Sequence, residues 1–106
     1  MAKLPVPLRF DWDQGNIEKN WQKHEVHFKE AEEVFFNKPL IILEDTKHPQ
    51  MEGRFIALGI TNKNRNLYVV FTIRSDKVSK AFPRIRIISA RDQSKSERRL
   101  YAEKEV

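Results

Sequence analysis

The amino-acid sequence predicts an α+β fold in which helices cover an antiparallel β-sheet in two layers. Apolar residues recur at helical spacing near both ends of the chain, whereas four runs between them are rich in β-branched and aromatic residues. The expected order is therefore a strand, two helices, four strands and a last helix. At 106 residues, the whole chain 1–106 is expected to form one domain around one core.

The first two elements are predicted at residues 8–12 and 14–24. Residues 8–12 alternate apolar and polar side chains, as a short strand does, and Asp13 offers an N-cap oxygen to a following helix. In the helix expected over residues 14–24, Trp21 occupies an apolar position, as Trp12 does in the strand. We therefore expect both tryptophan side chains to pack in the core.

A second helix is predicted over about residues 29–36, with three glutamates in its first turns. The sequence then changes to β-rich runs that form an antiparallel meander, at residues 40–43, 54–60, 67–74 and 84–90. Residues 75–83 form a longer connection before the last of these strands. The final helix is expected to begin at Asp92 or Ser94 and to end near Lys104.

The composition excludes several classes of protein. The chain has no cysteine, which rules out a disulfide framework and a thiolate metal site and fits the reducing cytoplasm in which we expect the protein. We expect no signal peptide and no membrane span, because no apolar run is long enough for either. With three glycines the chain has no glycine-rich phosphate loop, and His24 and His27 alone do not make a metal-ligand pattern. We therefore expect neither a metal nor a cofactor.

Positive charge is concentrated in the second half of the chain. Residues 1–60 contain 8 Lys and Arg against 10 Asp and Glu, whereas residues 61–106 contain 12 against 5. Such a basic half is typical of a protein that binds a polyanion, since each Lys or Arg near a phosphate releases condensed counterions. The alternative is a basic surface that is merely solvated.

Arginines gather on one face of the last two predicted strands. Strict alternation places Thr72 and Arg74 opposite the apolar residues of their strand, where they either point to solvent or line a groove. In the last strand Arg84 and Arg86 share a face, and Arg91 lies at the junction with the final helix. Clustered guanidiniums can bind a phosphodiester and stabilise the charge that develops during its cleavage. The alternative is that these arginines form ion pairs with the Glu-rich second helix.

Three residues are candidates for proton transfer beside the arginines. Glu97 and Tyr101 lie one helical turn apart on the last predicted helix, and either could move the proton of a ribose 2′-hydroxyl. The alternative interpretation makes Tyr101 a packing residue and Glu97 the surface partner of an arginine. His24 is a further candidate base, because imidazole titrates near neutrality.

Several segments follow one another in the order and spacing of a known family. They are Phe10-Asp11-Trp12-Asp13, Lys19-Asn20-Trp21-Gln22-Lys23-His24, Arg54-Phe55, Arg65-Asn66-Leu67-Tyr68-Val69-Val70-Phe71-Thr72-Ile73-Arg74, Ile85-Arg86-Ile87-Ile88-Ser89-Ala90-Arg91, and Glu97-Arg98 with Tyr101. Together they cover roughly residues 8–101 and resemble the BrnT-type toxins, which are ribonucleases of bacterial toxin-antitoxin pairs.

This resemblance implies a RelE-like fold and a metal-independent ribonuclease that cleaves RNA and arrests translation. It also implies neutralisation by a cognate BrnA-like antitoxin with a ribbon-helix-helix domain, and binding to operator DNA only through the toxin-antitoxin complex. On this basis the candidate site residues divide into two groups. Catalytic roles are predicted for Arg54, Arg74, Arg91, His24, Glu97 and Tyr101, and RNA-binding roles for Arg65, Arg84, Arg86 and Arg98.

Two features depart from the family pattern. Glu25 stands where the family usually has glycine, which argues against a glycine-type helix end at His24, because the left-handed conformation costs a residue with a Cβ about 1 kcal/mol. The connection at residues 75–83 is longer than usual, which could alter the access of RNA or the fit of the antitoxin.

Two other functions fit part of the pattern. A binding module that has lost catalysis could use the same basic surface to hold RNA or an acidic segment of the antitoxin. A DNA-binding repressor acting alone is disfavoured, since the sequence shows neither a helix-turn-helix nor a ribbon-helix-helix pattern.

Overall fold

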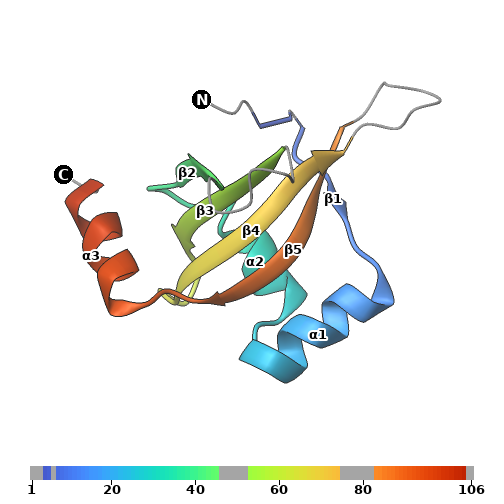
Figure 1. Cartoon of the computed structure of the whole chain (residues 1–106), viewed down its shortest axis with the longest axis horizontal. Coiled ribbons are helices and arrows are strands. Elements are labelled where there is room, and N and C mark those ends of the chain that lie inside the picture. Colours follow the sequence, from blue (N-terminus) through green and yellow to red (C-terminus); the bar gives the residue numbers. More distant parts are fainter. Residues whose placement is uncertain (1–3, 6, 46–52, 75–82, 105–106) are drawn as a thin grey trace.

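The computed structural model describes residues 4, 5, 7–45, 53–74 and 83–104 (Figure 1). Within these segments the elements are β1 (Phe10–Asp11), α1 (Gln14–His24), α2 (Phe28–Glu33), β2 (Ile41–Glu44), β3 (Arg54–Ile60), β4 (Asn66–Arg74), β5 (Arg84–Asp92) and α3 (Lys95–Lys104). The predicted α+β class and the predicted order of elements are confirmed. Most of the predicted connection at 75–83, namely residues 75–82, lies outside the described residues.

The sheet is mixed rather than purely antiparallel. Its strand order is β1-β5-β4-β3-β2, and the four strands from β2 to β5 form the expected antiparallel meander. The prediction was wrong for β1, which runs parallel to β5 with Phe10 opposite Ile85. A parallel pair needs a long connection, and the whole of α1, α2 and β2 to β4 lies between these two strands.

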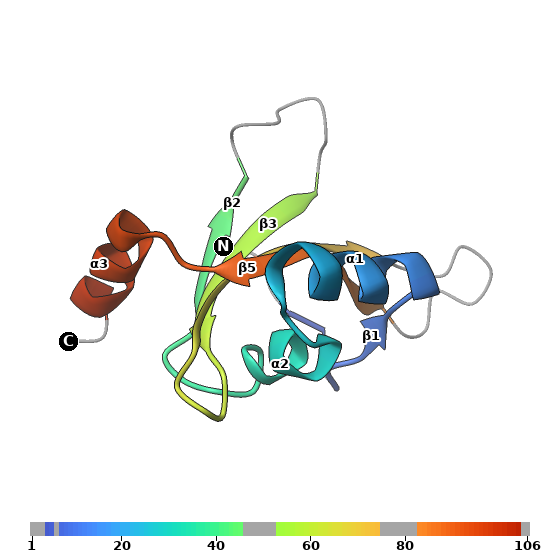
Figure 2. The ribbon, with the colours of Figure 1, turned by 90° about the horizontal axis from the view of Figure 1, so that it is seen from below.

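The main core lies between the sheet and the pair of helices α1 and α2, which lie on the same side of it (Figure 2). Its fully or nearly buried members are Val26, Ala31, Val34, Phe35, Ala57, Leu67, Val69, Phe71, Ile85, Ile87 and Ala90. Phe35 meets Phe71 edge to face, with ring centroids 5.1 Å apart. At Gly59 the sheet approaches α2 so closely that a Cβ would lie 2.4 Å from Cγ1 of Val34. The absence of a side chain there sets the distance between the two layers.

Helix α3 packs on the opposite face of the sheet, so the prediction of two layers was wrong: helices lie on both faces. Tyr101 is 3 % exposed and forms a second apolar cluster with Ile56 and Leu58 of β3. Its hydroxyl donates a hydrogen bond to the carbonyl oxygen of Pro39, just before β2. The interpretation of Tyr101 as a packing residue therefore agrees with its position.

Strand β1 pairs with only two residues of β5, Ile85 and Arg86. Along the rest of that edge of β5, polar side chains of α1 form hydrogen bonds with the β5 backbone. The Asn16 amide donates to the carbonyl of Ile87, and Lys19 Nζ donates to the carbonyl of Ile88 at 2.7 Å. Buried Asn20 accepts from the amide of Ala90 at 3.1 Å. These bonds satisfy backbone groups that an edge strand would otherwise leave open.

Asn20 explains why one of the two tryptophan predictions was wrong. Trp12 is half-buried against the core and donates from Nε1 to a carboxylate oxygen of Glu32 at 2.7 Å, as expected. Trp21, however, is 54 % exposed, because α1 turns its neighbour Asn20 toward β5. The indole instead lines a surface pocket of about 240 Å³ with Ile17 and Phe28.

Helix α2 is shorter than predicted. Its α-helical hydrogen bonding ends at Glu33, because the amides of Phe35 and Phe36 bond to carbonyls three residues back and tighten the last turn. Val34 and Phe35 nevertheless reach the core, as the apolar stripe predicted.

Helix α1 ends in a left-handed residue although that residue is not glycine. Glu25 has φ 53° and ψ 38°, and its amide donates to the carbonyl of Trp21 at 2.8 Å. The amide of buried Val26 then donates to the carbonyl of Asn20, which completes a Schellman-type end. The expectation that Glu25 argues against such an end was wrong. The carbonyls of His24 and Glu25 at this helix end accept hydrogen bonds from Arg65.

The close approach at Gly59 gives a direct test of the layer spacing. Gly59→Ala is expected to lower the free energy of unfolding by about 1–3 kcal/mol, because the new methyl overlaps buried Val34. Gly15→Ala is the matched control: its Cβ meets only a side-chain oxygen at 3.5 Å, in an exposed helical turn. Chemical denaturation of both variants decides the point, and equal stabilities would contradict the predicted overlap.

The strain at Glu25 gives a second test of the fold. Glu25→Gly is expected to raise the free energy of unfolding by about 0.5–1 kcal/mol, because glycine adopts φ 53° without a Cβ clash. Gln22→Gly, on the exposed side of the same helix, is expected to lower it by about 1 kcal/mol. A destabilised Glu25→Gly protein would show that the glutamate side chain itself supports this turn.

Candidate functional site

The face of the sheet opposite α1 and α2 carries most of the predicted arginines. We call it the open face and define it by Arg54, Tyr68, Thr72, Arg74, Arg84, Arg86 and Arg91. The strand register assigns these residues to one side: Thr72 lies between Arg54 on β3 and Arg86 on β5, and Arg74 lies opposite Arg84. Directly opposed residues in a sheet have neighbouring side chains, so Arg54, Thr72 and Arg86 form one row and Arg74 and Arg84 the next. Arg91 lies beside Tyr68, beyond the row of Val70 and Ser89.

A β-bulge in β5 brings Arg91 onto this face. Ile87 pairs with Phe71 and Ser89 with Val70, so Ile88 is an extra residue without a place in the ladder. Strict alternation would turn Arg91 away from Arg86, since an odd number of positions separates them. The inserted residue reverses the alternation and aims both side chains at the open face, which is a recognised effect of bulges.

At one end of the open face, Arg91 lies between an aromatic ring and a carboxylate. Its guanidinium carbon is 3.9 Å from the centroid of the Tyr68 ring. Its Nη1 and Nη2 donate to the two carboxylate oxygens of Glu97 at 2.8 and 3.0 Å. The two hydrogen bonds to Glu97 and the contact with the Tyr68 ring together fix the plane of the guanidinium.

Glu97 is held in turn by the start of α3. Its carboxylate accepts from the amide of Ser94 at 2.7 Å, and the Ser94 hydroxyl accepts from the amide of Glu97, which is a capping box. The ion pair with Arg91 and these bonds hold the pKa of Glu97 below its usual value of 4.5. A carboxylate with a lowered pKa is a weak base, so the geometry favours the interpretation of Glu97 as the partner of an arginine.

Tyr68 lies among four charged groups. Burial raises the pKa of the Tyr68 hydroxyl above 10.0, while positive Arg91 and Arg54 act against the rise and negative Glu97 and Asp45 add to it. Arg54 Nε lies 3.7 Å from the nearly buried carboxylate of Asp45. Tyr68 is therefore protonated at neutral pH and can donate a proton or a hydrogen bond between two arginines.

A second cluster occupies the other end of the open face. Arg86 binds Asp13 in a short ion pair and lies 3.6 Å from a carboxylate oxygen of Asp11. Arg74 is 63 % exposed and lies 4.0 Å from the same oxygen. Asp13 is also the N-cap of α1, and its bonds to Arg86 and to the amide of Asn16 lower its pKa. Arg74 and Arg86 thus pair with acids of β1 and of the start of α1, and the predicted alternative of pairing with α2 does not describe them.

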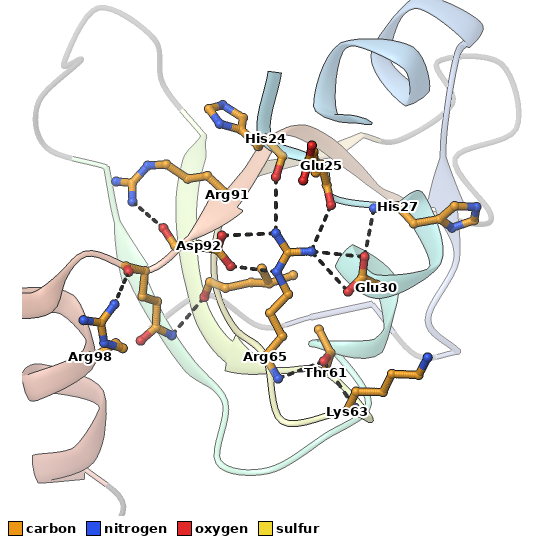
Figure 3. A network of polar contacts seen from close by, with 12 residues as sticks. His24, Glu25, His27, Glu30, Thr61, Lys63, Arg65, Arg91, Asp92 and Arg98 are labelled. Carbon is orange, nitrogen blue, oxygen red and sulfur yellow. Dashed lines mark hydrogen bonds and ion pairs between the residues drawn. The ribbon is translucent and has the colours of Figure 1, made fainter. Parts of the chain in front are cut away.

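The remaining predicted site residues lie away from the open face or at its margin. Arg65 is bound between α1, α2 and the end of β5 (Figure 3). Arg98 is exposed on α3 and donates to the carbonyl of Gln93 at 2.8 Å. The His24 ring points away from Arg65, and only the His24 carbonyl faces it (Figure 3). Tyr101 is the exception: it lies on the open face but is buried between α3 and β3, in the cluster against which Tyr68 packs.

Sequence reasoning missed Tyr68, Asp11 and Asp13 as members of the site. Tyr68 had been placed on the non-core face of its strand, but periodicity alone does not single out one residue of that face. The two aspartates stand more than 70 positions before Arg86, so only the parallel pairing of β1 with β5 brings them together.

Comparison with known proteins gives one family. The family model described as ribonuclease toxin, BrnT, of type II toxin-antitoxin system matches residues 12–97. No curated protein matches the chain. The matched segment includes Arg54, Tyr68, Arg86, Arg91 and Glu97.

Two further observations concern other classes of site. Within the part of the chain that is described, no group of three or more His, Asp or Glu residues is placed to hold a metal ion. Of the helices described, none is both long and apolar enough to cross a membrane.

The lowered pKa of Glu97 predicts a pH-dependent contribution to stability. Because the folded-state pKa lies below the unfolded one, the contribution is complete above about pH 4.5 and is lost as the pH falls through the folded value. Wild type should therefore exceed Glu97→Gln in stability at pH 6, and the difference should shrink toward pH 3. Denaturant titrations across this range measure it; a constant difference would show that ionisation of Glu97 has no part in it.

Proposed function

The chain belongs to the BrnT family of ribonuclease toxins of type II toxin-antitoxin systems, and we propose that it cleaves RNA on the open face. Membership of this family implies an RNA substrate and an antitoxin partner. The observation that carries the proposal is the bulge at Ile88, because it places Arg91 beside Tyr68 on the same face as Arg54 and Arg86. Tyr68 and Arg91 at one end of this face and Arg86 at the other thereby line one surface along which an RNA strand could lie.

The arginines are proposed to bind the phosphates of the RNA. Arg74 and Arg84 are exposed and suited to phosphates that flank the cleaved bond. Arg86 and Arg91 are partly covered, and each is already oriented by carboxylates. Arginines oriented before the substrate arrives need little reorganisation to stabilise the negative charge of the transition state. Arg54, next to Thr72, completes this set.

The proposed reaction is an internal transesterification. The ribose 2′-oxygen attacks phosphorus as its proton passes to a base, and the bond from phosphorus to the 5′-oxygen breaks as that oxygen takes up a proton. Tyr68 is proposed as the donor of this second proton, because its hydroxyl is protonated at neutral pH and its ring lies under Arg91. The products are a 2′,3′-cyclic phosphate and a 5′-hydroxyl, and no metal ion is required. His24 as the base stays a prediction.

Glu97 and Tyr101 receive supporting roles in this proposal. Glu97 orients Arg91 through two parallel hydrogen bonds, and Tyr101 attaches α3 to the sheet and to Pro39. Arg98 lies on the exposed side of α3 and is proposed to extend the RNA path. These roles rest on the contacts of each side chain rather than on its position in the sequence.

We also propose the finer biology that the sequence motifs imply. It comprises a RelE-like fold, arrest of translation, neutralisation by a BrnA-like ribbon-helix-helix antitoxin, and operator binding only through the complex. The order strand, helix, helix, sheet, helix supports the fold assignment. The acids that pair with Arg86 and Arg91 show that carboxylates fit this face, which supports an acidic antitoxin segment as its inhibitor.

A catalytically inactive binding module is the second candidate function. It is favoured by the ion pairs that occupy Arg86 and Arg91, since a surface that only holds RNA needs no free catalytic group. Turnover separates the two functions.

The test uses the purified chain with a defined single-stranded RNA under single-turnover conditions in EDTA. We expect Arg91→Gln to lower the cleavage rate about 100-fold by removing a charge-stabilising donor, and Tyr68→Phe to lower it about 100-fold by removing the proton donor. Arg99→Gln is the matched control, because Arg99 is exposed on α3 and has no contact with the open face among those described. Its rate should stay within about twofold of wild type, since a distant surface charge contributes little.

The product ends decide between the candidates. Cyclic-phosphate ends from wild type, lost in the two variants and kept in Arg99→Gln, support the proposal. Intact RNA that is nevertheless bound by wild type would establish the binding module, and wild-type rates in Arg91→Gln and Tyr68→Phe would place the chemistry elsewhere. Induction in bacteria with and without the cognate antitoxin then tests growth arrest.

A further inference from the structure

Arg65 has no free hydrogen-bond donor, although it stands in the basic half of the chain. A guanidinium has five N–H donors. Nε and Nη2 donate to the Asp92 carboxylate at 2.7 and 3.1 Å, Nη1 donates to the Glu25 carbonyl at 2.9 Å and to the Glu30 carboxylate, and Nη2 also reaches the His24 carbonyl at 3.2 Å. Figure 3 shows these bonds converging on one guanidinium from three directions.

The acceptors belong to three elements, α1, α2 and β5. The carbonyls of His24 and Glu25 are at the C-terminal end of α1, where helix carbonyls lack intrahelical partners and a positive charge is favourable. Glu30 is in the first turn of α2, and Asp92 is the last residue of β5. Arg65 itself immediately precedes β4. The Arg65 side chain therefore joins α1 and α2 to the end of β5 and the start of β4.

The end of β5 is also the segment that carries Arg91. Asp92 follows Arg91 directly, and the Asp92 carbonyl accepts a hydrogen bond from Arg91 Nη1 at 3.0 Å. The Asp92 side chain is held by Arg65 on the helix side of the sheet, while Arg91 lies over Tyr68 on the open face. A rotation of the Asp92 backbone would thus move the Asp92 carboxylate that Arg65 holds and the Asp92 carbonyl that Arg91 binds at the same time.

We propose that Arg65 is a positioning residue: it fixes the end of β5 from the helix side and so holds the Arg91 guanidinium over Tyr68 on the open face. This role takes the place of the RNA-binding role predicted for Arg65 together with the family resemblance. The inference rests on the proposed function, in which Arg91 stabilises the transition state. It adds that the site depends on a residue that never contacts RNA.

The two roles of Arg65 make opposite predictions. A phosphate ligand contributes to affinity, and its loss reduces the slope of log K against log salt by about 0.7 for single-stranded RNA. A positioning residue leaves affinity and slope unchanged and lowers the rate at saturating RNA, because a misplacement of about 1 Å can cost up to about 100-fold. Arg65→Lys separates them well, since lysine keeps the charge but loses the planar fork.

The experiment compares wild type, Arg65→Lys and Lys63→Gln, which removes an exposed charge from the same turn. Affinity and its salt slope are measured with 2′-O-methyl RNA, and single-turnover cleavage with unmodified RNA. We expect Arg65→Lys to cleave about 10-fold more slowly at saturation, with unchanged affinity and slope. Lys63→Gln should cleave at the wild-type rate.

A spectroscopic measurement tests positioning without RNA. The chain has two tyrosines, so the ring signals of Tyr68 and Tyr101 can be followed separately by NMR. Arg65→Lys is expected to shift the Tyr68 signals most, because Arg91 leaves the ring, and to shift those of buried Tyr101 less, because Tyr101 shares a cluster with Tyr68 but has no contact with Arg91 among those described. If Arg65→Lys does not fold, Asp92→Asn takes its place, since it weakens only the hold of Arg65 on β5.

The outcomes separate this inference from the proposed function. A normal saturated rate in Arg65→Lys would overturn the inference, because lysine keeps the charge that a phosphate ligand needs and loses only the planar fork that positioning needs. Unmoved Tyr68 signals with a normal rate would overturn it as well. If wild type binds RNA without cleaving it, the proposed function falls, whereas the Tyr68 signals still decide whether Arg65 positions Arg91.

Discussion

A single extra residue in β5 determines what the open face contains. Because Ile88 has no partner in the ladder, Ile87 and Ala90 both face the core and Arg86 and Arg91 both face away from it. Without the bulge, the end of β5 would either bury a guanidinium or expose Ala90. Helix α1 matches this irregularity, since Asn16 and Lys19 bind the carbonyls of Ile87 and Ile88. Side chains of α1 therefore supply hydrogen bonds to the β5 carbonyls at the bulge.

Ion pairs then orient the guanidiniums of Arg86 and Arg91 on this face. Arg86 is held by acids from β1 and from the start of α1, and Arg91 by an acid from α3, so elements far apart in the chain meet at one surface. Exposed pairs of this kind contribute little to stability. Their effect is geometric: they leave guanidiniums oriented before a polyanion arrives, and an incoming phosphate or acidic peptide can compete for them.

The sequence predicted the order of elements well, and the site only in part. The bounds of α1 and β3 follow from clear periodicity and suitable flanking residues, and both agree with the structure. The parallel pairing of β1, the exposure of Trp21 and the hydrogen bonds of Arg65 depend on contacts made across the fold, which a local pattern does not contain. The bulge left one local trace, the adjacent apolar pair Ile87 and Ile88, which breaks the alternation of the last strand. That this pair marks a bulge can be recognised only from the register of β5 with β4.

The most direct test of this account is to map where RNA binds. Backbone and arginine side-chain NMR signals of the whole chain would be followed during titration with 2′-O-methyl RNA, which binds without being cleaved. The account predicts that the affected signals belong to the open face, above all Arg86, Arg91 and Tyr68, with the pocket around Trp21 unaffected. Changes confined to α1, α2 and Trp21 would contradict it, because they would place the RNA on the other side of the sheet.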